Sequence, residues 1–432
     1  MTKPNIASFK AGQGGNMLGC VAVPIVAQDI ARNLGEVFAL WADERFSPGV
    51  NGDTPRPHLM IVVNRASDDQ LAHIQTLFQA YPQLETSFSG VSAHSVELEG
   101  ERDIYAPDDP DNAALGPVFG RKAGPNFLFQ RLIELGGHHG GFTLQLELDC
   151  LAVGAGWLKA VEMVIGDHPR AWVIGSHYAG SGLLGPDARS HLNGNALYRA
   201  EDPQFRAFFS DIWMPRLLHQ IKTRPDLAYD WWWSVERFEA DALVNNRSWR
   251  LFQTYDSFFH ADPYIVNLAV PEDGVQAYAR VFDRFVELGQ TPVFLHGPAM
   301  KGVRRALLQQ PQCGIFDVID ALDPPESSDV PARRLRLRPR LMRGAPAEPR
   351  AGEQAADAKS QDRSPVPQPP DQLLLRAAAT LLELERNEIQ AWLEPDCAHA
   401  QAIRAAYEFL GKAHPACVHF DRVRALARAR IP

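Results

Sequence analysis

Two acidic residues one position apart, at the end of an apolar run, have the types and spacing to bind a divalent cation. Glu147 and Asp149 follow the run that begins at Phe142, and residues 154–158 (GAGWL) then suit a turn and a helix start. Alternate residues of a strand lie on one face, so both carboxylates would project together from the strand end. Carboxylate oxygens are ligands that Mg²⁺ and Mn²⁺ prefer. The segment predicts a cation site or, alternatively, a buried strand that ends in solvated acids.

The segments around this motif alternate between strand and helix patterns. Apolar runs predict strands over Gly19–Ala27, His58–Asn64, Phe142–Leu148, Ala171–Gly175, Tyr264–Val270 and Thr291–His296. Helical spacing predicts helices over Gln28–Ala42, Leu71–Tyr81, Asn126–Leu135, Gly156–Met163 and most of Asp202–Ala242. The opening order of strand, helix, strand and helix indicates an α/β protein with a mainly parallel sheet.

The Glu-x-Asp motif resembles the acid motif, often written DxD, of glycosyltransferases with the GT-A fold. The order of elements carries the resemblance over residues 15–325. It implies a GT-A-like (Rossmann-like) α/β/α sandwich that moves a sugar from a nucleotide-diphospho-sugar to an acceptor hydroxyl, in glycan or polysaccharide synthesis. It also implies that Glu147 and Asp149 hold Mn²⁺ or Mg²⁺ on the diphosphate.

Residues 58–69 (HLMIVVNRASDD) are similar to the second-strand element that holds the base and ribose in this family. The resemblance assigns Asn64, Ser67 and Asp69 to the nucleoside, with Asn64 in place of the usual acid. An Asn side chain can both donate and accept hydrogen bonds to a base. The alternative is an Asx or Ser turn after a strand.

Residues 119–129 (FGRKAGPNFLF) resemble the basic, glycine-containing stretch that leads into a helix before the acid motif in related transferases. Backbone N–H groups at a helix start favour phosphate. The resemblance places Lys122 on the phosphates, where Arg121 could also add charge, and Asn126 near the nucleotide. A solvated basic loop is the alternative.

Residues 190–199 (SHLNGNALYR) interleave polar side chains with a glycine before a short strand start at Ala196–Tyr198. The segment resembles the loop that contacts donor sugar or acceptor in certain GT-A transferases, which makes His191, Asn193 and Asn195 sugar-binding residues. Each of these side chains can donate or accept hydrogen bonds. Asn-Gly is equally a common tight turn.

Residues 293–301 (VFLHGPAMK) place a histidine at a strand end and a lysine five positions later. The resemblance makes His296 the third metal ligand, and imidazole is a ligand that suits Mn²⁺ beside Mg²⁺. It assigns Lys301 to the charge that develops on the leaving nucleoside diphosphate.

An inverting transferase needs a carboxylate that deprotonates the acceptor hydroxyl, whereas a retaining one does not. Asp230, in YDWWWSV, is the candidate base, with Glu236 and Asp256 as competitors. Three consecutive tryptophans cannot all face a core, so at least one of Trp231–Trp233 is expected at the surface or along a cleft, where it could stack on a sugar.

Two other functions stay open. A sugar nucleotidyltransferase usually has a glycine-rich, arginine-containing loop directly after its first strand, which the Gln28-Asp29-Ile30 segment lacks. A non-catalytic carbohydrate-binding or assembly protein would keep the fold without turnover. Glu147 in place of the first Asp of the motif, and Asn64 in place of an acid, keep this alternative open.

Composition and charge bound the remaining possibilities. A formal charge of −9 argues against a general nucleic-acid binder, and five scattered cysteines fit a reducing compartment, so we expect a cytoplasmic protein. The first residues lack the apolar core of a signal peptide, and no run approaches a membrane span. We expect an Arg/Pro-rich, disordered linker over 326–370, with possible peripheral membrane contact, and a small helical tail over 371–432.

Overall fold

The computed structural model describes residues 16–49, 55–105, 118–180, 184, 186–242, 247–268 and 273–322. Contacts divide the chain into two units, and the described elements belong to the first, apart from 238–242 and 247–250, which belong to the second. The predicted Arg/Pro-rich linker and the helical tail lie outside the described residues. The domain limits therefore stay predictions.

A seven-stranded sheet in the order β3-β2-β1-β4-β7-β6-β8 forms the centre of the first unit. Its strands are β1 (Leu18–Val26), β2 (His58–Asn64), β3 (Val91–Val96), β4 (Phe142–Gln145), β6 (Val173–Gly175), β7 (Leu197–Tyr198) and β8 (Phe259–Ala261). All neighbouring pairs are parallel except the two that β7 makes with β4 and β6. The mainly parallel α/β sheet predicted from the sequence is confirmed.

A second sheet of three short strands has the order β5-β10-β9. It consists of β5 (Cys150–Ala152), β9 (Ile265–Asn267) and β10 (Phe294–His296), with β10 antiparallel to β5 and parallel to β9. The chain passes from the large sheet to the small one between Gln145 and Cys150, which is the acid motif. The motif therefore lies where the two sheets meet.

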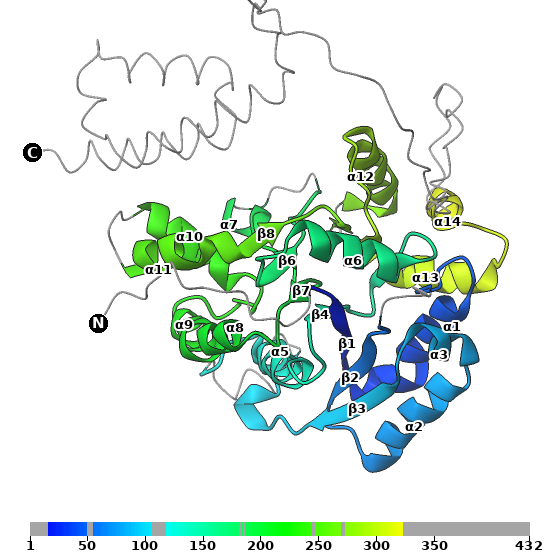
Figure 1. Cartoon of the computed structure of the whole chain (residues 1–432), viewed down its shortest axis with the longest axis horizontal. Helices are drawn as coiled ribbons and strands as arrows, with labels where there is room; N and C mark the ends of the chain where they lie inside the picture. The colour runs from blue at the N-terminus through cyan, green and yellow to red at the C-terminus, as the bar shows by residue number, and fades with distance from the viewer. Residues whose placement is uncertain are drawn as a thin grey trace, which may run out of the picture. The chain divides into compact units, whose positions relative to one another are not determined.

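Helices cover both faces of the large sheet. Figure 1 shows α5 (Ala123–Gly136) on one side of β1 and β2, with α1 (Gly35–Ala42), α2 (Asp68–Gln79) and α3 (Pro82–Ser87) on the other. The other helices are α6 (Trp157–Asp167), α7 (Pro186–Arg189), α8 (Pro203–Phe208), α9 (Met214–Gln220), α10 (Trp232–Ala242), α11 (Arg247–Tyr255), α12 (Val275–Glu287), α13 (Met300–Gln309) and α14 (Ile315–Leu322). Of the described helices, none combines the length and the apolar character that crossing a membrane requires.

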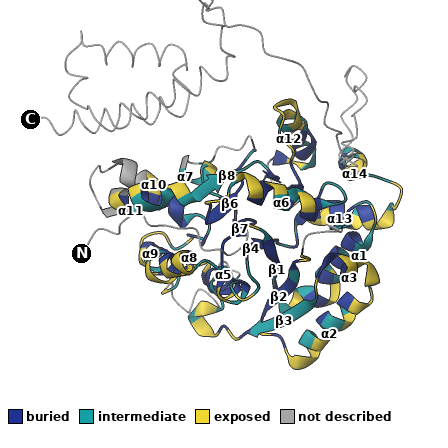
Figure 2. Cartoon of the chain, viewed as in Figure 1, coloured by how far each residue is buried: buried dark blue, intermediate teal, exposed yellow. Residues whose placement is uncertain are grey.

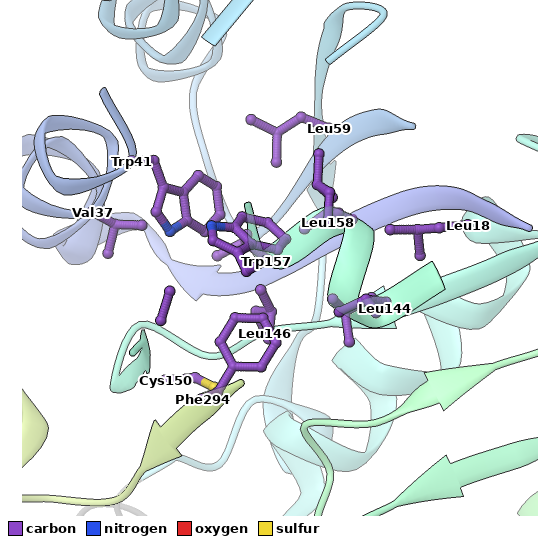
Figure 3. Close-up of a cluster of buried hydrophobic side chains, with 14 of the residues drawn as sticks. Leu18, Val37, Trp41, Leu59, Leu144, Leu146, Cys150, Trp157, Leu158 and Phe294 are labelled. Carbon is purple, nitrogen blue, oxygen red and sulfur yellow. The ribbon is translucent and has the colours of Figure 1, made fainter. Parts of the chain in front are cut away.

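Buried side chains follow the strands, and exposed residues lie on the outer faces of helices such as α2 (Figure 2). One large apolar cluster joins the two sheets, as shown in Figure 3: Trp41 from α1 and Trp157 from α6 have ring centroids 5.5 Å apart, and Trp157 also contacts Phe294 of β10. Leu146 and Cys150 are part of this cluster. Both ends of the acid motif are thus anchored in the core.

Several predicted elements differ in detail from the structure. The strand predicted over Phe142–Leu148 ends at Gln145, because the chain then turns toward the small sheet. The helix predicted over Gln28–Ala42 is a 3₁₀ turn (Ala27–Asp29), a π turn (Ile30–Leu34) and then α1. Strands β3, β5 and β8 were missed; β5 and β8 have three residues each, too few to show a period, and β3 is polar.

Three histidines lie close together where β2, β3 and the loop of residues 136–141 (GGHHGG) meet. The rings of His58 and His139 stack at 4.3 Å, and the Nε2 atoms of His58 and His94 lie 2.8 and 3.1 Å from the Ser92 hydroxyl oxygen. Burial lowers the pKa of all three, and the charges of His58, His94 and His138 further lower the pKa of His139 to about 4.

These histidines make the protein less stable in acid. Between pH 4 and 6.5, His139 binds more protons in the unfolded chain, whose ordinary pKa is 6.5, than in the folded one. The free energy of unfolding must therefore fall as the pH is lowered through this window. We expect His139→Gln to flatten that fall, measured by urea unfolding at several pH values. An unchanged slope would show that the cluster does not control acid stability.

Candidate active site

The acid motif forms a tight turn between β4 and β5, and this replaces the strand end expected from the sequence. Leu146 and Leu148 are buried, whereas the Glu147 and Asp149 side chains are 41% and 19% exposed. The Cys150 N–H donates to the Glu147 carbonyl at 3.0 Å and closes the turn. The two carboxylates still project together, because the buried residues on each side alternate with them.

His296 completes the group. Strand register in the small sheet pairs His296 with Cys150 on one side and Asn267 on the other. Its Nε2 atom lies 3.3 Å from Glu147 Oε2 and 3.5 Å from Asp149 Oδ1. One ligand atom from each of the three residues lies within 4.8 Å of the other two. The three side chains predicted as metal ligands therefore come together.

Asn267 orients the imidazole, and sequence reasoning missed it. The Nδ1 atom of His296 lies 3.0 Å from the Asn267 Oδ1 atom, which can only accept, so Nδ1 donates and Nε2 faces the carboxylates. A fixed second nitrogen of this kind is typical of histidines that bind metals. Asn267 could not be found from the sequence because its position beside His296 depends on the pairing of β9 with β10.

The electrostatics of the cluster favour a cation. Burial alone would lower the pKa of His296, but hydrogen bonds and charge from Asp149 and Glu147 raise the pKa to about 10. Burial alone would likewise raise the pKa of Asp149, but His296 and the charge of Lys301 hold that pKa below its usual range. Two carboxylates and an imidazole are a donor set that fits Mn²⁺ and, with less preference for nitrogen, Mg²⁺.

The Asn-Gly-Asn segment links this cluster to Asp230. Asn195 accepts from the Glu147 N–H at 2.6 Å, and its Nδ2 donates to Glu147 Oε2 at 3.2 Å and to Asn193 Oδ1 at 2.9 Å. Asn195 is fully buried and Asn193 is 7% exposed. The Asn195 amide is therefore occupied within the protein, where it contacts Glu147, and the sugar contact expected from the sequence stays a prediction.

Asp230 lies on the far side of the same segment. The Gly194 N–H donates to Asp230 Oδ2 at 2.9 Å, and His191 Nε2 lies 3.8 Å from the same oxygen. Burial and the charge of Glu147 raise the pKa of Asp230, against the opposite effect of His191. A Cβ at position 194 would lie 2.1 Å from the Tyr229 hydroxyl oxygen, so this turn requires glycine. The sequence-predicted base and His191 are therefore neighbours.

The two competitors for the base are held elsewhere. Glu236 is 1% exposed and accepts from both Nε and Nη2 of Arg216. Asp256 accepts from the Trp233 indole N–H at 3.2 Å. A buried carboxylate that already neutralises a guanidinium is a poor base, because protonation would leave that charge unpaired. Asp230 is the candidate that the geometry favours.

The three consecutive tryptophans differ in burial, as expected from the sequence. Trp232 is fully buried and Trp233 is 7% exposed, and both pack among aromatic rings that include Trp213 and Phe259. Trp231 is only half-buried, and its ring centroid lies 6.3 Å from that of His191. Trp231 is thus the one of the three that lies beside the candidate site.

The predicted nucleoside residues lie at the carboxyl end of β2. Asn64 pairs with Val26 at the end of β1, so the two strands end at one edge. Asn64 Nδ2 donates to Asp103 Oδ1 at 2.6 Å, and Arg65 donates to Asp103 Oδ2 at 3.0 Å. Asp103, missed from the sequence, brings a carboxylate beside the position where an acid was expected.

Ser67 and Asp69 begin α2. Ser67 is the N-cap, accepting from the Gln70 N–H at 3.3 Å, and Asp69 lies exposed in the first turn. The turn alternative is thus present at Ser67. With the strand order β2-β1-β4, one strand separates the strand that ends at Asn64 from the strand that leads into the acid motif.

Lys122 and Asn126 have different surroundings. Lys122 is exposed and is the N-cap residue of α5. The Gly124 N–H of this helix donates to the carbonyl of Ile104, the residue that follows Asp103. Lys122 therefore lies at the same edge as Asn64. Asn126 is fully buried; its Oδ1 accepts from Tyr229 N at 2.7 Å and its Nδ2 donates to the Leu227 carbonyl at 3.2 Å. Asn126 thus supports the segment before Asp230, and the nucleotide contact expected for it stays a prediction.

Lys301 lies in the first turn of α13, exposed and close enough to Asp149 to lower its pKa. Gly297 lies between His296 and this helix, and its φ is +142°. A Cβ at this position would lie 2.1 Å from the Leu268 carbonyl oxygen, so both the backbone conformation and the space require glycine. The Gly297 N–H donates to the Asp149 carbonyl at 3.3 Å. The lysine is therefore tied to the acid turn.

Neither a protein-family model nor a curated protein matches the chain. Solved structures that resemble it include two proteins described as a glycosyltransferase and a xylosyltransferase. GlyE of Streptococcus pneumoniae has a TM-score of 0.31 and 9% identity, with 71% of this chain and 63% of that one covered. Mouse xyloside xylosyltransferase 1 has a TM-score of 0.32 and 11% identity, with 65% and 97% covered. S. aureus TarS has a TM-score of 0.23 and 15% identity, with 45% and 29% covered.

The chain thus spans 63% of the length of the first of these proteins. TM-scores of this size carry no information on substrate or reaction, so the residues of the site must carry the functional inference.

Proposed function

We propose that the protein is a metal-dependent glycosyltransferase that moves a sugar from a nucleotide-diphospho-sugar to an acceptor hydroxyl. The observation that supports this most is the convergence of Glu147, Asp149 and His296 at the junction of the two sheets, with Asp230 linked to them through Asn195 and Gly194. In open α/β sheets, ligands bind at the carboxyl ends of the strands. The cluster lies at that edge, where a nucleotide is expected.

Glu147, Asp149 and His296 would hold Mn²⁺ or Mg²⁺. A divalent cation there neutralises the charge on a diphosphate, which is the main demand of a reaction whose leaving group is a nucleoside diphosphate. Lys301 and Lys122 carry positive charge at the same edge and would bind the phosphate oxygens. Asn64, Ser67 and Asp69 would border the nucleoside, with Asp103 beside Asn64.

The sugar would lie between the cluster and Asp230. His191 and Trp231 both border Asp230, so they supply a hydrogen-bonding group and a ring face for it. If the reaction inverts the anomeric carbon, Asp230 takes the proton from the acceptor hydroxyl, and its raised pKa suits that task. Glycan or polysaccharide acceptors follow from the same proposal.

Local structure after the first strand disfavours the nucleotidyltransferase alternative. β1 runs directly into the helical turns at Ala27–Asp29 and Ile30–Leu34, and no glycine-rich, arginine-containing loop intervenes. A binding protein without turnover differs from the proposed enzyme in one measurable respect, since it would not cleave a donor.

The test is slow hydrolysis of nucleotide-sugars by the purified chain. UDP, GDP, CMP and dTDP donors are incubated with Mn²⁺, Mg²⁺ or EDTA, and release of the nucleoside diphosphate or monophosphate is measured. We expect one donor class to be cleaved with Mn²⁺ or Mg²⁺ and not with EDTA. Folded protein that binds donors but cleaves none of them would establish the binding-protein alternative.

A further inference from the structure

Arg304 is a fully buried cation on α13, one helical turn beyond Lys301. Its guanidinium makes three different contacts: Nε donates to Glu36 Oε2 at 2.9 Å, Nη2 donates to Asn33 Oδ1 at 3.1 Å, and Nη1 donates to the Leu148 carbonyl. Leu148 is the residue between the two carboxylates of the acid turn. A buried side chain of α13 therefore contacts the turn that carries the proposed ligands.

A buried charge is costly unless it is paired and hydrogen-bonded, so these three partners are needed for Arg304 to occupy its place. The planar fork of a guanidinium also fixes the direction of each hydrogen bond, which a lysine ammonium does not. Glu36 comes from α1 and Leu148 from the acid turn. Arg304 thus fixes α13, α1 and the turn relative to one another.

All three carbonyls of the turn have a donor. The Glu147 carbonyl accepts from Cys150 N, the Asp149 carbonyl accepts from Gly297 N, and the Leu148 carbonyl accepts from Arg304. The first two donors are backbone groups, which any sequence with this fold would supply. The third is a side chain, so it depends on the arginine.

We propose that Arg304 is a positioning residue for the active site, a role that rests on the proposed function. By holding the Leu148 carbonyl it directs the Glu147 and Asp149 side chains away from the core and toward the cation. Because Lys301 lies on the same helix, Arg304 also sets the place of this lysine relative to the two carboxylates. Arg304 itself touches neither substrate nor metal.

Arg45 offers a matched control. It holds the opposite end of α13, donating to the carbonyls of Gln310 at 3.2 Å, Leu307 at 3.4 Å and Cys313, and it pairs with Asp43 at 2.6 Å. Among the described contacts it makes none with the acid turn. Loss of either guanidinium removes hydrogen bonds that hold α13 in place, but only Arg304 donates to the Leu148 carbonyl.

The experiment compares the wild type, Arg304→Lys and Arg45→Lys at a temperature where all three are folded. Mn²⁺ affinity is measured by electron paramagnetic resonance of the free ion, and amide hydrogen exchange of residues 146–151 is measured in the metal-free proteins. We expect Arg304→Lys to weaken Mn²⁺ binding about 10- to 100-fold, as loss of a group that orients metal ligands does, and to speed exchange in 146–151 several-fold. Arg45→Lys should change neither.

The proposal would be overturned if both variants lowered the unfolding temperature equally and Arg304→Lys left Mn²⁺ affinity and exchange in 146–151 unchanged. Arg304 would then contribute to stability alone. If Arg304→Lys does not fold, Glu36→Gln, which removes the charge that pairs with Arg304, takes its place in the same comparison. A wild type that binds no Mn²⁺ would contradict the proposed function, whereas exchange in the metal-free protein would still decide the role of Arg304.

Discussion

Asp149→Asn is expected to reduce metal-dependent donor hydrolysis about 100-fold or more, since loss of a direct ligand must cost at least as much as loss of a residue that orients one. The substitution keeps the size of the side chain and removes the negative charge that faces His296 Nε2 at 3.5 Å. One hard oxygen ligand then becomes a neutral amide, which binds Mn²⁺ weakly. The rate of hydrolysis should be measured at saturating donor and increasing Mn²⁺ concentration. The loss should appear chiefly as a higher Mn²⁺ concentration needed for half-maximal rate.

The chain contains a matched acid for the control. Asp262 Oδ2 lies 3.0 Å from His168 Nε2, and its side chain is 20% exposed, against 19% for Asp149. Asp262→Asn therefore removes an acid of similar exposure that also faces a histidine, outside the proposed metal site. It should retain hydrolysis and its metal requirement. Equal activity in Asp149→Asn and the wild type would remove Asp149 from the mechanism.

Asp230→Asn is expected to reduce sugar transfer by about 100- to 10,000-fold if Asp230 is the base of an inverting reaction. The amide cannot take a proton, but its oxygen can still accept from the Gly194 N–H, which Asp230 Oδ2 accepts at 2.9 Å. The Asn-Gly-Asn turn and its contact with Glu147 should therefore persist. Mn²⁺ affinity should stay within about threefold of the wild-type value, because Asp230 is not a proposed ligand.

The pH dependence separates this role from a structural one. Transfer by the wild type should fall as the pH is lowered through the raised pKa of Asp230, because only the carboxylate form can accept the acceptor's proton. Asp230→Asn should lose this fall along with the rate. Asp256→Asn, at one of the competing acids, is the control and should behave like the wild type. Full transfer by Asp230→Asn would point to a retaining reaction that needs no base.

The sequence predicted the large sheet well where its elements were long and regular. β1, β2 and α5 bury continuous or periodic apolar residues, and their positions agree with the expected segments within a few residues. The small sheet was predicted only in part. β9 and β10 lie within the expected strands, but the three-residue β5 directly after the acid motif was missed, because short segments owe their structure to pairing partners far away in the chain.

The same distinction applies to the candidate site. Glu147, Asp149 and His296 could be named because their types and chain order are informative, and the structure brings them together. Asn126 was assigned to the nucleotide from the family resemblance, and Asn195 to a sugar because an amide can donate or accept. Like Asn64, both are buried and hydrogen-bonded within the protein. Asn267, Asp103 and Arg304 carry no local signal, since each acts through a neighbour that only the fold supplies.

The most direct test of the central claim is a Mn²⁺ titration of the wild type and of His296→Ala, followed by electron paramagnetic resonance with and without nucleoside diphosphates. We expect one bound Mn²⁺ per chain and tighter binding with the diphosphate of the preferred donor. Binding should be strongly weakened in His296→Ala, because the His296 side chain faces both carboxylates. Wild-type protein that is folded but binds no Mn²⁺ under either condition would contradict the proposed metal site.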